Sequence, residues 1–146
     1  MNLMRATLAA LVLAGIATTT GYTLSAQKPK SQWDGVYTDA QAERGAALYK
    51  TQCADCHGPT MDGKDDAKPL TGEEFRENWN EASIGEIFER IRATMPQSSP
   101  GSLTPVQTAD IVAAILKKNA FPAGGAELKA EGDSLYEIKF YSTKPQ

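Results

Sequence analysis

The residues of this sequence that could do chemistry are concentrated in five positions. Residues 53–57 read CADCH and contain both cysteines and the only histidine of the 146 residues. Two thiols two residues apart on a helical turn can reach the two vinyl groups on one edge of a porphyrin. The histidine that follows can bring an imidazole nitrogen to the iron. The spacing is therefore that of the attachment motif for a c-type haem.

Three other functions of this motif stay open on the residues alone. A structural zinc site uses about four ligands, mostly Cys and His, and only carboxylates remain after Cys53, Cys56 and His57. A thioredoxin-like redox pair needs a βαβ setting, whereas the flanking sequence predicts helices and loops. A structural disulfide suits an exported protein but gives His57 no role. Haem is favoured because it uses all three residues and needs no further cysteine or histidine.

A six-coordinate haem needs a second axial ligand, and methionine is the candidate because the chain has no second histidine. Two of the four methionines lie in the N-terminal segment, and Met61 is only four residues from His57. A buried methionine is usually core filler. Met95, however, lies at the end of an amphipathic helix and directly before Pro96. This position favours Met95 as the distal iron ligand.

The first 26 residues differ from the rest of the chain. Arg5 is their only charged residue and is followed by the apolar stretch ATLAALVLAGIA. This pattern is typical of a secretory signal peptide and predicts cleavage after Ala26 and a periplasmic protein. An uncleaved membrane anchor is the alternative, because the apolar stretch up to Leu24 is about 17 residues long, near the lower limit for spanning a bilayer.

The composition is that of one small globular domain. The chain is 41% hydrophobic and 23% charged, and its formal net charge is -3. Charges of both signs are interspersed, so we expect no nucleic-acid partner. After the signal peptide (1–26), we expect an extended lead-in over residues 27–37, a folded domain over residues 38–119 and an extended tail over residues 120–146.

A helix before CADCH and a loop after it are predicted to position the motif. Thr38 is a suitable N-cap for a helix from Asp39 to about Lys50. Gly45 inside that helix weakens it, which suggests that another backbone passes close by. Residues 58–72 are dense in Gly, Pro and Asp and predict a loop, followed by a short helix around residues 73–77.

Two capping boxes mark the later helices. Ser83, with the glutamate three residues on, begins a helix with one apolar face that ends near Thr94, because a proline follows. Thr104, with the glutamine three residues on, begins the last helix. The tail shows no helical period, and no strand pattern is convincing. Its expected anchors are Phe121, Leu135, Tyr136, Ile138 and Phe140.

In chain order, four stretches resemble the class I c-type cytochromes, specifically the small bacterial monohaem proteins of the subunit type. They are ERGAALYKTQCADCHG, KPLTG, IFERIRATMP and LTPVQTADIVAAILKKN. They are similar to that family's haem-motif helix, haem loop, distal methionine loop and C-terminal helix, and cover about residues 38–119. The resemblance implies an all-α fold in which the N- and C-terminal helices cross beside one haem c bound covalently through Cys53 and Cys56.

The resemblance also implies further cofactor-binding residues. Pro69 corresponds to the family proline whose carbonyl accepts the imidazole N–H of the proximal histidine, here His57. Leu70 corresponds to a leucine that packs on the haem. Trp79 is expected to donate its indole N–H to a haem propionate, and a half-buried surface tryptophan is the alternative.

One position departs from the family pattern. Gly45 and Tyr49 match the glycine and the aromatic residue of the N-terminal helix. Ala114, in contrast, stands where the family commonly has an aromatic residue in the C-terminal helix. This leaves the details of the helix crossing open, with Phe121 or a tail aromatic as the candidate to fill the gap.

These observations predict a periplasmic electron carrier that moves one electron at a time, with His57 and Met95 as iron ligands. The resemblance implies redox protein partners: a dehydrogenase, such as a quinoprotein, as donor and an oxidase or another cytochrome as acceptor. It implies no enzymatic activity of its own, although the protein could serve as a subunit of a dehydrogenase complex. The alternatives are a haem enzyme or gas sensor with an open sixth position, and a non-haem thiol redox protein.

Overall fold

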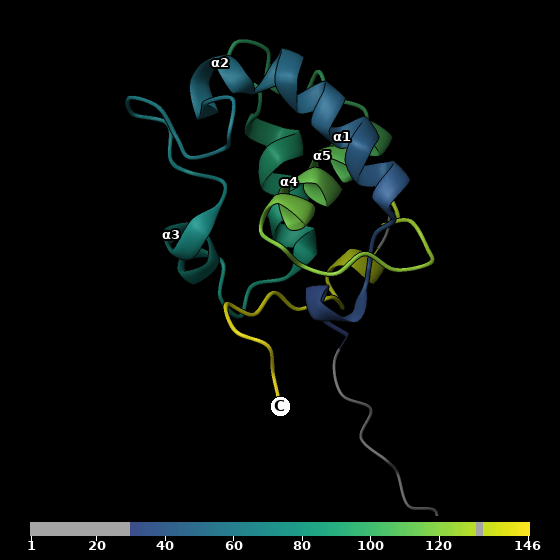
Figure 1. Cartoon of the computed structure of the whole chain (residues 1–146). Coiled ribbons are helices and arrows are strands. Elements are labelled where there is room, and N and C mark those ends of the chain that lie inside the picture. Colours follow the sequence, from purple (N-terminus) through teal and green to yellow (C-terminus); the bar gives the residue numbers. More distant parts are fainter. Residues whose placement is uncertain (1–29, 131–132) are drawn as a thin grey trace, which may run out of the picture.

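The computed structural model describes residues 30–130 and 133–146. The predicted signal peptide and the first residues of the lead-in lie outside this part. Within it the protein is helical and has no strand, only isolated β-bridges, which confirms the all-α prediction. The elements are η1 (Gln32–Asp34), α1 (Asp39–Gln52), α2 (Ala54–His57), α3 (Gly72–Asn78), α4 (Ile84–Thr94), α5 (Pro105–Lys118) and η2 (Asp133–Leu135) (Figure 1). No described helix has the length and apolarity needed to cross a membrane.

The predicted helix starts are confirmed by their caps. The Thr38 side chain accepts a hydrogen bond from the backbone N–H of Gln41 at the start of α1. Reciprocal capping boxes open α4 at Ser83 and α5 at Thr104. Caps of this kind contribute about 1 kcal/mol each, so local sequence fixes where the helices begin.

Helices α1 and α5 touch backbone to backbone, which confirms the close approach predicted from Gly45. A Cβ atom added to Gly45 would lie 1.7 Å from the carbonyl oxygen of Asp110 and 3.0 Å from the Cβ of Ala114. Only glycine allows this contact. Figure 1 shows the two helices packed together beside α4. The angle at which they cross stays a prediction.

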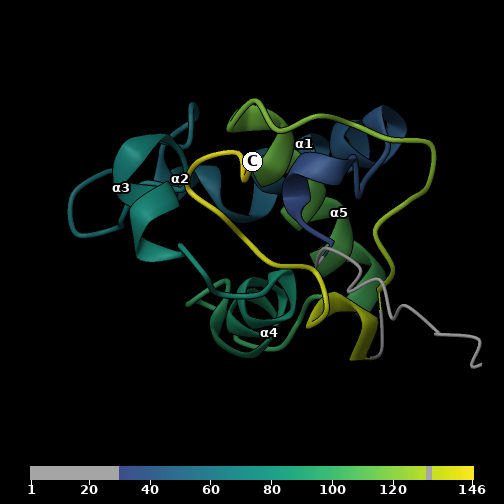
Figure 2. The same cartoon turned by 90° about the horizontal axis from the view of Figure 1, so that it is seen from below.

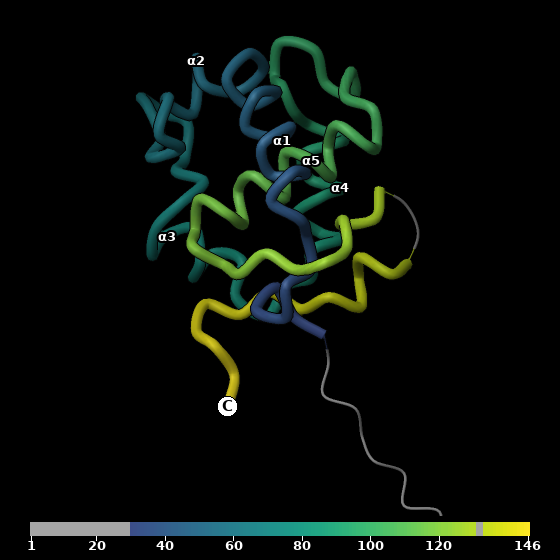
Figure 3. The backbone as a smooth tube through the Cα atoms, turned by 45° about the vertical axis from the view of Figure 1, so that its right-hand side comes forward, coloured from purple at the N-terminus to yellow at the C-terminus, as the bar shows by residue number. Residues whose placement is uncertain are grey.

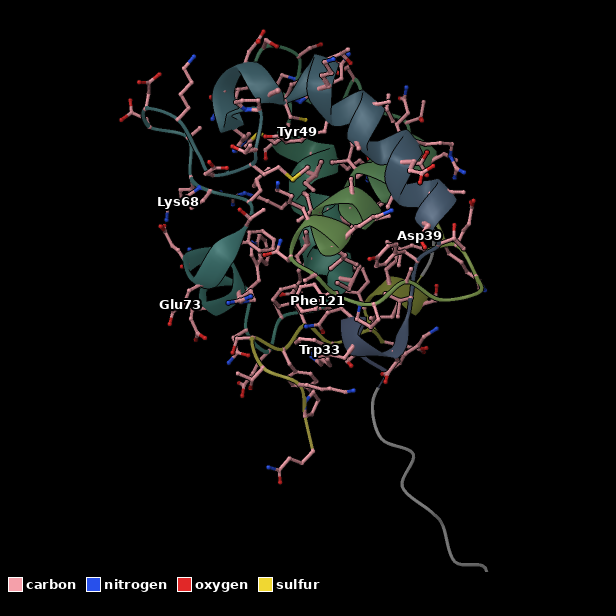
Figure 4. All side chains as sticks on the ribbon, viewed as in Figure 1. Trp33, Asp39, Tyr49, Lys68, Glu73 and Phe121 are labelled. Atoms are coloured by element: carbon pink, nitrogen blue, oxygen red, sulfur yellow. The ribbon has the colours of Figure 1, made fainter. Side chains whose placement is uncertain are left out.

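The gap beside Ala114 is not filled by an aromatic side chain. Phe121 instead packs edge-on against Trp33 and Phe140, with ring centroids 4.7 and 5.3 Å apart; Figure 4 shows Phe121 next to Trp33. A groove of about 530 Å³ remains, called here the α1–α5 groove. It is lined by Ala42, Ala46, Tyr49, Lys50, Ala54, Pro59, Met61, Ala114, Lys117 and Lys118.

The tail packs on the domain next to the lead-in. Four of its five expected anchors are buried: Phe121, Leu135, Ile138 and Phe140. Tyr136 remains 48% exposed, although its ring covers Gly85 of α4. Ser31 and Lys139 form a parallel bridge, and the Gln32 side chain is hydrogen-bonded to the backbone of Tyr141. Figure 3 shows the lead-in and the tail side by side at the base of the molecule.

Candidate haem site

The predicted site residues come together around one cavity of about 560 Å³, called here the haem cavity. This volume falls in the range of roughly 300–1,000 Å³ that is usual for cofactor sites. The end of α1, α2, the loop after it, α3, α4 and α5 all contribute to its walls. Its lining includes every predicted site residue: Cys53, Cys56, His57, Pro69, Leu70, Trp79 and Met95. Their binding to a cofactor stays a prediction.

The CADCH motif forms the junction of α1 and α2. The Cys53 N–H donates to the carbonyl of Tyr49 (2.9 Å), and the His57 N–H donates to the carbonyl of Cys53 (2.9 Å). Both cysteines carry free thiols. Burial, and secondarily the neighbouring Cys56, raises the pKa of the Cys53 thiol to about 11. In the chain before haem attachment, this thiol is therefore protonated at neutral pH.

The Tyr49 side chain supports the motif from behind. Its hydroxyl donates a 2.5 Å hydrogen bond to the carbonyl of Gly58, the residue directly after His57. Burial raises the pKa of this phenol to about 12, so the hydroxyl stays a donor at neutral pH. The aromatic residue of α1 thereby holds the end of the haem-binding motif in place.

The His57 ring is oriented by a backbone carbonyl. Its Nδ1 lies 2.9 Å from the carbonyl oxygen of Lys68. A bond at Nδ1 makes Nε2 the nitrogen available to a metal. The expectation that the Pro69 carbonyl is the acceptor is wrong by one residue. The physical reason is that Pro69 restricts Lys68 to extended backbone, which holds the Lys68 carbonyl in a fixed direction.

The loop that carries Lys68 is held by its own backbone and by α5. Gly63 donates to the carbonyl of His57 (3.0 Å) with φ of +86°, and an added Cβ would lie 2.7 Å from the Ala67 oxygen. The Asn119 side chain, at the end of α5, donates to the Leu70 carbonyl (2.9 Å) and accepts from the Gly72 N–H (3.1 Å). These bonds fix the loop between α2 and α3, where Figure 4 places Lys68.

Met95 reaches the cavity because α4 ends at the residue before it. Its N–H closes the helix on the carbonyl of Ile91 (2.9 Å), while its own backbone is extended, with φ of -122° and ψ of 152°. Met61, the other methionine in the described part of the chain, is only 5% exposed and lines the α1–α5 groove. Of these two, only Met95 borders the haem cavity.

Sequence reasoning missed much of the cavity wall. Ile87 and Ile91 could have been found, because their i, i+4 spacing places them on the face of α4 that carries Met95. Phe75 and Arg90 also line the cavity, and neither gave a signal beyond a partly apolar or charged helix. Trp79, a predicted residue, is half-buried, and its indole N–H has no hydrogen-bond partner among the described residues.

The donor set fits a c-type haem better than the alternatives. Two free thiols and an imidazole meet a thioether across a cavity whose walls include Leu70, Phe75 and Ile111. Within residues 30–130 and 133–146, no three His, Cys, Asp or Glu side chains come together in a way that could hold a metal ion. The same residues offer no βαβ unit for a thioredoxin-like pair.

Comparison with known proteins agrees with this chemistry. The family model of cytochrome c oxidase, cbb3-type, subunit III matches residues 40–115, just over half of the chain. No curated protein matches it. Among solved structures, the sulfane dehydrogenase SoxCD from Paracoccus pantotrophus is 22% identical, with a TM-score of 0.43; the similarity covers 78% of this chain and 59% of that chain. Such a score is too low to bear on function.

The family match and the CADCH motif together assign the cofactor. Proteins of this cytochrome c type carry haem c with its iron, and Cys53 and Cys56 have the spacing for its covalent attachment. The protein is thus a haem-based electron carrier, and the chain belongs to the cbb3-type cytochrome c oxidase subunit III family.

Proposed function

We propose that this protein is a periplasmic one-electron carrier whose iron is ligated by His57 and Met95. It receives electrons from a dehydrogenase, such as a quinoprotein, and passes them to an oxidase or another cytochrome. It transfers electrons and catalyses no reaction of its own, alone or as a subunit of a larger complex. Bound haem supplies the reversible one-electron change at iron.

One observation carries this proposal. The CADCH motif and Met95, which are far apart in the sequence, border the same cavity. The hydrogen bond from His57 Nδ1 to the Lys68 carbonyl directs the other ring nitrogen away from that carbonyl. The only other described methionine lies in a different cavity. An axial pair of one imidazole and one thioether follows, which is typical of electron-transfer cytochromes.

The remaining residues of the cavity set the properties of the site. Side chains such as Leu70, Phe75 and Ile115 exclude water, which favours the less charged ferrous state. We assign Trp79, whose indole N–H has no partner within the described residues, to a haem propionate. The Lys68 carbonyl keeps the His57 ring in one orientation and makes it a stronger donor.

Export is proposed from the sequence of the first 26 residues, with Arg5 before an apolar stretch. N-terminal sequencing of the protein from a host that processes such signals tests this. A start near Gln27 is expected. An intact Met1 in the membrane fraction would instead favour an anchored protein facing the periplasm.

The ligation is tested by replacing each described methionine. Met95→Ala should leave haem attached, open the sixth coordination position and bind carbon monoxide rapidly when reduced. Its reduction potential should fall, because a thioether ligand raises the potential. Met61→Leu is the matched control, since Met61 is buried outside the haem cavity. The control should keep the weak far-red band of the ferric wild-type protein, which Met95→Ala should lose.

The opposite result would point to another function. If the wild-type protein lacks the far-red band and binds carbon monoxide as fast as Met95→Ala, the thioether is not on the iron. The protein would then be a haem enzyme or gas sensor with an open position. A reduced protein without any haem absorption would leave a thiol redox protein.

A further inference from the structure

The C-terminal tail lies outside the part of the chain that matches the family, yet it is part of the core. The match ends at residue 115. Leu135, Ile138 and Phe140 are nevertheless only 2%, 6% and 0% exposed. A segment that merely covered the surface would not contribute a fully buried aromatic ring. Residues 135–141, called here the tail segment, therefore have a specific place in the fold.

The backbone of the tail segment is hydrogen-bonded on both sides. On one side, Phe140 donates to the carbonyl of Ala82 (2.8 Å) and accepts from the N–H of Glu81 (2.7 Å). On the other side, Lys139 donates to the carbonyl of Lys30 (2.8 Å). Figure 2 shows the segment passing between α4 and the lead-in. It thus fixes the connection between α3 and α4, the two helices that bring Phe75 and Met95 to the cavity.

The Phe140 side chain stands directly behind one wall of the haem cavity. Its ring packs edge-on against Phe75, with centroids 5.8 Å apart and planes at 89°. Phe75 in turn contacts Trp79, with centroids 6.5 Å apart. Both Phe75 and Trp79 line the cavity, whereas Phe140 does not. Phe121 and Trp33 continue the row of rings behind Phe140.

We propose that Phe140 is a positioning residue of the haem site, through which the tail segment sets the reduction potential. By filling the space behind Phe75, it keeps Phe75 and Trp79 against the cofactor and keeps water out of that wall. Without the ring, a cavity remains that neighbouring side chains fill only in part. The wall then loosens, water enters, and the more highly charged ferric state is favoured. This proposal rests on the proposed function only in taking the haem cavity as the cofactor site.

The test compares two buried residues of the C-terminal region. Phe140→Ala and Phe140→Leu remove the ring behind Phe75. Leu128→Ala is the matched control, because Leu128 is 3% exposed, is bonded through its backbone to the Gln41 side chain and is not part of the cavity wall. The reduction potential of each holoprotein is measured by spectroelectrochemical titration, and its midpoint of thermal unfolding is measured in parallel.

A lower potential in Phe140→Ala is expected, with a smaller fall in Phe140→Leu, which keeps part of the volume. Leu128→Ala should lower the unfolding midpoint and leave the potential unchanged. If every Phe140 variant that folds has the potential of the Leu128→Ala control, Phe140 is ordinary core and the proposal is overturned. All comparisons are with the wild-type protein in its own ligation state. A missing far-red band in the wild type would contradict the Met95 assignment without deciding the role of Phe140.

Discussion

The haem cavity and the α1–α5 groove are nearly equal in size, about 560 and 530 Å³, and share almost nothing in chemistry. The haem cavity collects two thiols, an imidazole, a thioether and aromatic walls from distant parts of the chain. The groove is lined mainly by alanines and lysines. One of those lysines, Lys117, is paired with Asp39 at 2.8 Å and lies 3.9 Å from Glu43. The phenol of Tyr49 is also occupied, by Gly58.

The difference teaches that a hollow is identified by the groups that converge on it, and that volume alone does not identify it. The groove exists because Gly45 and Ala114 allow α1 and α5 to touch, which leaves small side chains along the contact. It is a by-product of helix packing. The haem cavity, in contrast, is bordered by side chains whose chemistry would be costly to bury without a partner.

The largest expected effect concerns the thiols. Replacing Cys53 and Cys56 together by Ala should abolish covalent haem, because no other cysteine exists in the chain. Haem staining after denaturing electrophoresis and the mass of the purified protein measure this. A double variant that still carries haem through denaturation would remove the chemical distinction between the two cavities.

The next effect concerns the contact beneath the groove. Gly45→Ala should destabilise the holoprotein by about 3 kcal/mol, the upper part of the usual range for overpacking, because its Cβ would overlap the Asp110 carbonyl. Chemical denaturation measures this. Gly125→Ala is the control, since nothing lies within 4 Å of its added Cβ. Equal stability of the two variants would mean that the backbones of α1 and α5 are not in contact.

A smaller effect is expected where the two cavities meet. Tyr49 lines the groove, and its hydroxyl holds the residue after His57. Tyr49→Phe removes one buried hydrogen bond and should cost about 1 kcal/mol while the far-red band is kept. Thermal unfolding and the ferric spectrum check both parts. A lost band with unchanged stability would indicate that the hydroxyl acts on the iron ligands, which the comparison does not allow.

The smallest effect is expected in the groove itself. Ala46 is exposed on its lining, so Ala46→Leu should change stability by no more than about 0.5 kcal/mol. The spectra and the reduction potential should equal those of the wild-type protein. A shifted potential would sharpen the comparison in an unexpected way, because it would couple the groove to the haem cavity through α1.

Local signals in the sequence were sufficient for the helices and for most of the site. Capping residues such as Ser83 and Thr104 act within one helical turn, so the predicted starts agree with the structure. The helix predicted to end near Thr94 ends there. The predicted short helix around residues 73–77 is observed as α3, Gly72–Asn78.

What the sequence could not show depends on long-range contacts. Which carbonyl faces His57 is decided by the path of a loop, so the expectation named Pro69 where the structure has Lys68. Tyr136 was expected to be an anchor with the other tail residues, and its exposure depends on how η2 lies over α4. The position of Phe140 behind Phe75 joins residues far apart in the chain, and no periodicity records such a contact.

The pairing of the lead-in with the tail has a consequence for how this protein can be combined with others. Because Ser31 lies beside Lys139, and Gln32 beside Tyr141, the chain enters and leaves the fold at adjacent points. A domain with neighbouring ends can be inserted into a surface loop of a host protein without separating the two sides of that loop. The unit to transplant would run from Lys30 to Ser142, well beyond the matched stretch, and would arrive with its electron-carrying site already enclosed.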